Sequence, residues 1–286
     1  MLSHLKRRIG VFAAVAVLAA GVPALTTTPA SAAPSTSLTL AVTDPATYSA
    51  CPTGSAAAAG FTDTTSTDVD CIKMYGITTG VTATTYEPTA SVPRWQMALY
   101  LTRMAGPTQV TLGTGADQGF TDISGKSAEI QTAINQIKQL GVTVGKTATT
   151  FAPDDNVTRE EMALFIQRML HATPTGAGGE SDSALTLNVD GDGGTYNYTD
   201  IDTNVTVEGK DAIVELWNLG VHDGLLATTY SPNSDMTRAA MATFLTAALA
   251  HTNARPAGLV MQTDKATDQG SWTAATSISH RSAAFV

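Results

Sequence analysis

The sequence predicts a mainly α-helical protein made of three helix–loop–helix repeats that share one hydrophobic core. The first observation is a pattern of glycine, aromatic, proline and arginine residues that occurs three times in the same register, without a gap. The second is that each copy ends in a segment whose apolar residues recur at helical spacing. A single pair of short helices cannot bury such a face, so the three copies are expected to pack their stripes together.

The chain begins with a segment, residues 1–32, that is typical of a secretory signal peptide. Basic residues at 6–8 precede an apolar run over about 9–22, and the small residues at 30–32 supply a cleavage point. This run is shorter than the roughly 20 residues that span a membrane. We therefore expect a secreted protein with no membrane insertion after signal cleavage.

The chain is acidic, with 25 Asp and Glu against 16 Lys and Arg and a formal net charge of −9. The signal segment contributes cations and no acids, so the rest of the chain is more acidic still. This balance argues against nucleic acid and anionic lipid as partners. The five histidines are scattered, with no pair at metal-ligand spacing, so neither a metal nor another cofactor is expected.

The two cysteines, Cys51 and Cys71, predict one disulfide. An even pair in an exported chain is most simply a bond that closes the loop between its members. Closing such a loop stabilises the fold by about 3 kcal/mol in the chain-entropy model. The alternative is a reactive or metal-binding thiol, which is disfavoured because no histidine cluster accompanies the pair.

After the signal peptide, the pattern divides the chain into a lead-in, three repeats, two linkers and a tail. The segments are, in order, an Ala/Thr/Ser-rich lead-in (33–59), the first repeat (60–105), a linker (106–118), the second repeat (119–171), a linker with a β-hairpin (172–197), the third repeat (198–250), and the start of a β-domain or tail (251–286).

Each repeat opens with an aromatic residue two positions before an aspartate, followed by a helix that ends at a glycine. The aspartates of these motifs are Asp63, Asp122 and Asp200. The expected C-terminal glycines, which adopt a left-handed conformation cheaply, are Gly76, Gly141 and Gly220. A second glycine stands four residues later and either permits a tight loop or lets a ligand approach the backbone: Gly80, Gly145 and Gly224.

The second helix of each repeat is expected to start near an arginine and to bury one apolar stripe. The stripe residues fall at i, i+3, i+4 and i+7, which assigns them to packing rather than to a cofactor site. They are Met97, Tyr100, Leu101 and Met104, then Met162, Phe165, Ile166 and Met169, then Met241, Phe244, Leu245 and Ala248.

Strand-like segments are expected between the helical units and in the tail. They are 37–42, 108–113, a hairpin of 184–189 with 195–199, and the alternating tail segments 254–262 and 271–279. The hairpin turn DGDGG is favoured over a calcium loop, because a glycine stands where the third acidic ligand of an EF-hand belongs and no acid closes the loop.

The three units resemble S-layer homology repeats, modules that attach exported bacterial proteins to the cell envelope. The resemblance covers residues 60–250 with interruptions and rests on the FTD motif, the helix ending in G-[IV], the loop G-x5-[FY]-x-P and the T-R-x-E motif that opens the second helix. It implies an all-α pseudo-threefold bundle with grooves between repeats. It also implies noncovalent binding of secondary cell-wall polysaccharide, often pyruvylated, at the cell wall or cell surface.

In that family the motif arginine binds the anion and the motif glutamate supports the site. Carried over to this chain, the ligand-binding arginines are Arg94, Arg159 and Arg238. Only the second repeat has the full motif, with Thr158 and Glu161 around Arg159. The first repeat reads PRWQ and the third reads TRAA, so both depart from the pattern.

Physical reasoning supports a special role for these arginines. The helix dipole disfavours a cation in the first turn by about 0.3–1 kcal/mol, so another interaction must offset that loss. An anion held by the free N–H groups and the guanidinium would do so, with Trp95 against the sugar and Thr158 and Glu161 as a capping box. The alternative is an internal ion pair with an FTD aspartate of a neighbouring repeat.

The favoured function is therefore a polysaccharide-binding module that anchors an exported protein, and not an enzyme. No G-x-S-x-G elbow or metal-ligand set is visible and the acids are dispersed, which disfavours catalysis within these residues. One alternative is a glycan-processing enzyme whose catalytic part lies outside this chain. Another is a subunit that self-associates in a surface layer through its strand edges.

Overall fold

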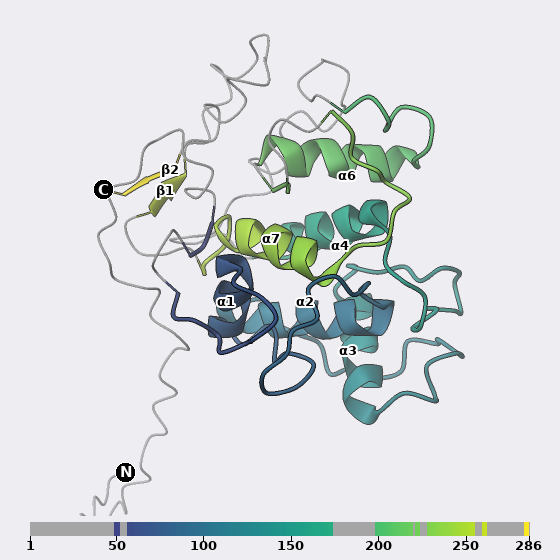
Figure 1. The fold of residues 1–286 in the computed structure, drawn as a ribbon. Helices are drawn as coiled ribbons and strands as arrows, with labels where there is room; N and C mark the ends of the chain where they lie inside the picture. Colours follow the sequence, from purple (N-terminus) through teal and green to yellow (C-terminus); the bar gives the residue numbers. More distant parts are fainter. Residues whose placement is uncertain are drawn as a thin grey trace, which may run out of the picture.

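The structure is a computed structural model that describes residues 49–51, 56–173, 198–219, 221–223, 228–254, 259–261 and 283–285. Within these residues it is mainly α-helical, as predicted (Figure 1). The elements are α1 (Thr67–Met74), α2 (Arg94–Thr108), α3 (Ala128–Gln139), α4 (Arg159–His171), α6 (Val207–Asn218), α7 (Arg238–Leu249), β1 (Leu259–Met261) and β2 (Ala283–Phe285). No described helix is both long and apolar enough to cross a bilayer.

The helices pack in a closed ring of three pairs. The first helix of each repeat lies against the second helix of the preceding repeat, giving the pairs α2 with α3, α4 with α6, and α7 with α1. In Figure 1, α6 lies above α4, and α3 lies below α2. The repeat of the sequence is therefore not the packing unit, because every pair combines two repeats and the α7–α1 pair closes the ring.

Three backbone hydrogen bonds join the repeats around a pseudo-threefold axis. The N–H of Val92 donates to the carbonyl of Met236 (2.9 Å), Met236 to Val157 (2.8 Å), and Val157 to Val92 (2.9 Å). Each residue lies two positions before the arginine that starts a second helix, so the three helix starts are held at one end of the axis. All three side chains are fully buried.

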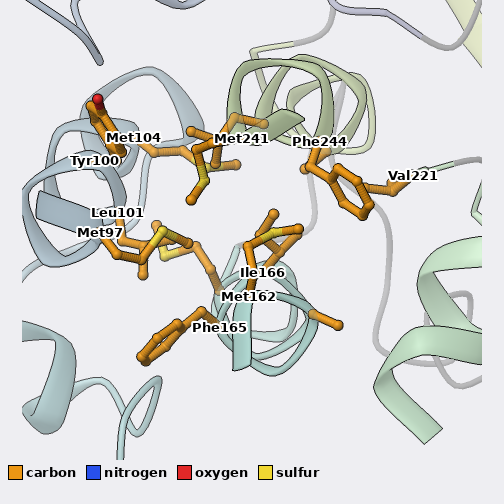
Figure 2. Close-up of a cluster of buried hydrophobic side chains, with 14 of the residues drawn as sticks. Met97, Tyr100, Leu101, Met104, Met162, Phe165, Ile166, Val221, Met241 and Phe244 are labelled. Carbon is orange, nitrogen blue, oxygen red and sulfur yellow. The ribbon is translucent and has the colours of Figure 1, made fainter. Parts of the chain in front are cut away.

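The core is formed by the predicted stripes. Figure 2 shows methionine and aromatic side chains of α2, α4 and α7 pointing toward one another, among them Met97, Met162 and Met241. These three side chains are fully buried. Burying an apolar side chain of this size stabilises the fold by roughly 1.5–3 kcal/mol, so packing explains the stripes fully.

The glycines have structural roles where the structure describes them. Gly76 and Gly141 follow α1 and α3 with φ of +70° and +75°, the left-handed conformation predicted for them. Gly80 and Gly145 also have positive φ, and a Cβ on either would collide with the ring of Phe61 or Phe120. The second position of these loops therefore has to be glycine, because an aromatic ring of the same repeat leaves no room for a Cβ. Gly220 and Gly224 lie outside the described residues.

The predicted disulfide is confirmed and reinforces the ring closure. Cys51 and Cys71 are bonded, with an S–S distance of 2.01 Å. Cys71 lies on α1, which has 8 residues against 12 in both α3 and α6. The neighbouring Ala50 N–H donates to the carbonyl of Thr246 on α7 (3.0 Å). The lead-in therefore strengthens the α1–α7 pair, whose outer helix is the shortest.

The β predictions are corrected in part. Residues 108–113 form no strand, because α2 runs to Thr108 and the following residues bind α3 instead of another strand. Gln136 Nε2, for example, donates to the Gly113 carbonyl (2.9 Å). In the tail, β1 lies within the predicted segment 254–262 and pairs antiparallel with β2. The signal peptide, 37–42, the hairpin up to residue 197 and 271–279 lie outside the described residues.

Candidate ligand site at the repeat junctions

Each motif arginine is the first residue of a second helix, as predicted. Thr158 caps α4 by accepting from the Glu161 N–H, and Glu161 reaches back to the Thr158 N–H, which completes the predicted capping box. Thr237 caps α7 in the same way through the Ala240 N–H. Pro93 occupies the N-cap position of α2 without a side-chain hydrogen bond, because proline offers no acceptor atom on its side chain.

The N–H groups at these helix starts are already used. The Arg159 and Glu160 N–H groups donate to the carbonyls of Ser234 and Pro232 in the next repeat (2.9 and 3.0 Å). The first two residues of α2 and of α7 donate to their own next repeats in the same manner. The N–H groups that the anion argument relied on therefore bind the neighbouring loop, and any anion has to be held by side chains.

The FTD aspartates hold loops and do not pair with the arginines, so the alternative of an internal ion pair with these acids is wrong. The Asp122 carboxylate accepts from the Phe151 N–H (2.9 Å) and the Ala152 N–H (2.7 Å). Asp63 and Asp200 accept from the equivalent N–H groups of their own repeats. The two N–H bonds stabilise the left-handed conformation of Ala152, whose φ is +55°.

Each arginine instead binds the aromatic loop residue of the next repeat, through a hydrogen bond to its carbonyl and a contact with its ring. We call this arrangement a junction. The first junction contains Arg94 and Phe151, the second Arg159 and Tyr230, and the third Arg238 and Tyr86. In each, Nε donates to the carbonyl of the aromatic residue, at 2.8, 2.6 and 2.5 Å. The guanidinium carbon lies 4.7, 4.7 and 4.5 Å from the centre of that ring, at cation–π distance.

At the first junction an acid of the protein neutralises the arginine. Arg94 Nη1 lies 3.1 Å from Glu161 Oε1, and Lys146 Nζ lies 2.5 Å from the same oxygen. Burial lowers the pKa of Arg94, and Glu161 opposes that shift. Arg94 is 3% exposed, whereas Lys146 and Glu161 are both partly exposed, so the cluster reaches solvent through the lysine and the glutamate.

At the second junction the neutralisation is bidentate. Arg159 Nη1 and Nη2 donate to the two carboxylate oxygens of Asp223, at 2.6 and 2.9 Å. Burial disfavours the charged guanidinium, but the Asp223 hydrogen bonds more than offset it and raise the pKa of Arg159. Fork-to-fork pairing of this kind is the strongest geometry available to an arginine and a carboxylate.

Among the described residues, no acid pairs with the arginine of the third junction. Arg238 is 2% exposed, and its Nη1 and Nη2 atoms are buried without a hydrogen-bond partner among the described residues. The hydroxyl of Tyr100, whose ring centre lies 6.0 Å from the Arg238 guanidinium carbon, is also buried; it makes no hydrogen bond of standard geometry within the described residues, but Thr78 and Arg238 lie near it. Burial raises the pKa of Tyr100, so its hydroxyl stays protonated and can donate.

The structure brings some of the predicted site residues together and separates others. Arg94 and Glu161 meet at the first junction with Thr158 beside them, whereas the three arginines lie at three different junctions. Trp95 is half-buried against the core and its N–H donates to the Pro153 carbonyl (2.9 Å). Sequence reasoning missed Asp223 and Tyr100. No described group of three or more His, Cys, Asp or Glu residues is arranged to hold a metal.

Comparison with known proteins identifies the domain. Residues 119–163, within the second predicted repeat, match the family described as S-layer homology domain. A stretch of 93 residues is 39% identical to an endoglucanase of Bacillus sp. (strain KSM-635) and covers 32% of this chain and 9% of the endoglucanase. The comparison thus supports an S-layer homology domain around residues 119–163, and such a domain indicates association with the cell surface or cell wall.

Proposed function

Because the chain carries an S-layer homology domain, we propose that it anchors an exported protein to the cell envelope by binding wall polysaccharide noncovalently at its repeat junctions. The ring of three helix pairs supplies a rigid support, since each junction ties two repeats by backbone and side-chain hydrogen bonds. Secretion through the signal peptide and residence at the cell wall belong to the same proposal.

The ligand that we propose is a polysaccharide with a carboxylate group, such as a pyruvyl ketal. One observation carries this choice: a buried arginine, Arg238, keeps two Nη atoms without an acceptor among the described residues. An uncompensated buried charge is costly, so a fold retains it where it serves binding. A carboxylate matches the fork of a guanidinium better than a neutral sugar hydroxyl does.

We propose binding rather than catalysis for this chain. Asp63, Asp122, Glu161 and Asp223 are engaged in loop capping or in ion pairs, so these carboxylates are not free to work as an acid and base pair. The match to an endoglucanase favours a second role, in which the anchoring unit serves a glycan-processing enzyme whose catalytic part lies outside this chain.

The test is retention of the purified chain on wall polysaccharide. We expect the chain to cosediment with purified wall polymer, to be displaced by salt, and to remain in solution with neutral dextran. The same sample should release no reducing sugar from the polymer, and light scattering of the free chain separates a monomer from a self-associating subunit. Failure to cosediment under low-salt conditions contradicts the anchoring function, whereas release of reducing sugar contradicts the binding-only assignment.

A further inference from the structure

The residue two positions before the second glycine closes the loop of each repeat, and it differs in the third repeat. In the first two repeats it is a threonine, Thr78 or Thr143, and each is 2% exposed. The threonine hydroxyl accepts from the N–H of the second glycine, at 3.2 Å for Gly80 and 3.1 Å for Gly145. A small neutral side chain, with no titratable group, therefore closes these two loops.

The third repeat has a histidine, His222, at this position. Its Nδ1 atom is buried and has no hydrogen-bond partner among the described residues. The residue before it, Val221, belongs to the hydrophobic core together with Phe244 (Figure 2). The residue after it, Asp223, binds Arg159 at the second junction. The histidine thus lies between a core residue and an ion pair that joins the third repeat to α4.

A proton on the His222 ring is costly at this place. Neutral imidazole has one N–H group and one acceptor nitrogen, whereas imidazolium has an N–H group on both nitrogens. Protonation therefore leaves a buried Nδ1–H group without an acceptor in the described part of the chain, on a ring that also carries a charge. Burial lowers the pKa of His222, and the neighbouring Asp223 carboxylate opposes that shift without cancelling it.

The helices around the loop do not compensate the charge of an imidazolium. Within the described residues, Asp223 is the one charged group that acts on the ring, and Arg159 of α4 already holds both of its oxygens. Glu215 of α6 accepts from side chains of α4 instead. Burial raises the pKa of Tyr198 and of Tyr230, so both hydroxyls stay neutral. In α7 the charged residue is the arginine at its start, which lies at the third junction.

We propose that His222 makes the contact between the third repeat and α4 sensitive to pH, so that the loop around it opens in mild acid while the threonine-closed loops stay shut. The unfolded chain binds a proton at this histidine near pH 6.5, and the folded loop resists it. The contribution of the loop to stability is therefore present above about pH 6.5 and is lost as the pH falls below it. This pH sensitivity is separate from the anchoring function and needs no polysaccharide.

The decisive variant is His222→Thr, which gives the third repeat the residue that closes the loops of the first two. The matched control is His171→Gln, which removes a different histidine from the same α4–α6 region. His171 Nε2 lies 2.7 Å from Glu215 Oε1, where an acid favours a proton on the ring instead of opposing it. Each variant removes one histidine, so a difference between them isolates the effect of His222.

Denaturant unfolding of the full chain at pH 7.5 and pH 5 measures the effect on stability. Acidification should raise the unfolding equilibrium constant of wild type about tenfold more than that of His222→Thr, because one proton binds the unfolded wild-type chain preferentially. His171→Gln should remain as sensitive to acid as wild type or become more so. An NMR titration of the His222 ring in folded wild type should give a midpoint below the value of about 6.5 for an unperturbed histidine.

Hydrogen exchange locates the opening within the fold. The Val221 N–H donates to the Leu216 carbonyl (2.8 Å), and the Val142 N–H makes the equivalent bond to Ile137 in the second repeat (2.9 Å). Between pH 7.5 and pH 5, the protection factor of Val221 should fall more than that of Val142 in wild type. In His222→Thr the two protection factors should change equally.

Four results overturn the inference. One is the same pH dependence of unfolding in wild type and His222→Thr. Another is an NMR midpoint at or above about 6.5 for the His222 ring. A third is an equal change of protection at Val221 and Val142 in wild type. The last is a loss of acid sensitivity in His171→Gln, which would assign the effect to that histidine.

Discussion

Replacing Arg159 by methionine probes the largest set of junction contacts. The substitution removes the Nε hydrogen bond to the Tyr230 carbonyl and the bidentate pair with Asp223, while an apolar chain of similar length remains between the rings of Tyr230 and Phe244. The free energy of unfolding should fall mainly because Asp223 and a buried carbonyl lose their partners.

The magnitude follows from the burial of the stranded groups. Breaking a buried ion pair by removing one partner costs 3–5 kcal/mol, and the low end applies because the Asp223 side chain is 31% exposed. We expect a loss of about 3 kcal/mol, which lowers the thermal midpoint of a domain of this size by about 6–12 °C. Adding Asp223→Asn to the variant should restore about half of the loss, since the amide carries no charge.

Thermal unfolding followed by circular dichroism measures these changes, and Arg238→Met provides the matched comparison. Within the described residues Arg238 has no counter-ion to strand, so its replacement removes one hydrogen bond, from Nε to the Tyr86 carbonyl, and should cost about 1 kcal/mol. The reasoning is refuted if Arg159→Met unfolds within about 2 °C of wild type, which corresponds to a loss of about 1 kcal/mol or less, or if the two arginine variants are equally destabilised.

Three further predictions concern the closure of the ring and its pH dependence. Replacing both cysteines by serine should cost about 3 kcal/mol, measured by denaturant unfolding, and a reductant should produce the same loss in wild type; equal stability of oxidised and reduced protein contradicts this. Backbone N–H bonds from Glu87 and Tyr86 lower the pKa of Asp63, so its contribution to stability should be present above about pH 4 and lost as pH falls; Asp63→Asn should flatten that part of the stability profile, and an unchanged slope contradicts it. Burial raises the pKa of Asp68, so its charged form weakens the fold as pH rises; Asp68→Asn should raise the thermal midpoint at pH 7 but not at pH 3, and a lower midpoint at pH 7 contradicts it.

Much of the local structure followed from the sequence because the repeats are in register. The helix starts at Arg94, Arg159 and Arg238 and the helix-ending glycines Gly76 and Gly141 were all predicted from spacing. Helix periods, caps and turns depend on residues a few positions apart, and a threefold alignment averages out accidental matches.

The packing partners could not be predicted in the same way. That α1 packs on α7, at the far end of the chain, depends on contacts between distant segments, which no periodicity encodes. The sequence left an ion pair between an arginine and an FTD aspartate open as an alternative, and only the structure shows that Asp122 turns back to its own loop. The segment 108–113 alternates as a strand does, but a strand needs a hydrogen-bonded neighbour, and α3 offers side chains instead.

The candidate site was predicted only to the level of its arginines. Asp223 occupies a position that is neutral in the other repeats, so the comparison of the repeats did not single it out. Tyr100 was assigned to the apolar stripe, which is correct for its ring but leaves out its hydroxyl. The differences between repeats, rather than their agreement, distinguish the three junctions. A sequence search for repeats emphasises agreement and therefore misses them.

The most direct test of anchoring through a junction is the retention of Arg238→Met on purified wall polysaccharide, compared with wild type at equal salt. The variant should fold with nearly wild-type stability, so a change in retention reports on binding alone. We predict a loss of affinity of about tenfold or more, because the ligand carboxylate loses its charged donor. Wild-type retention of the folded variant would contradict the central claim that this guanidinium holds the polymer.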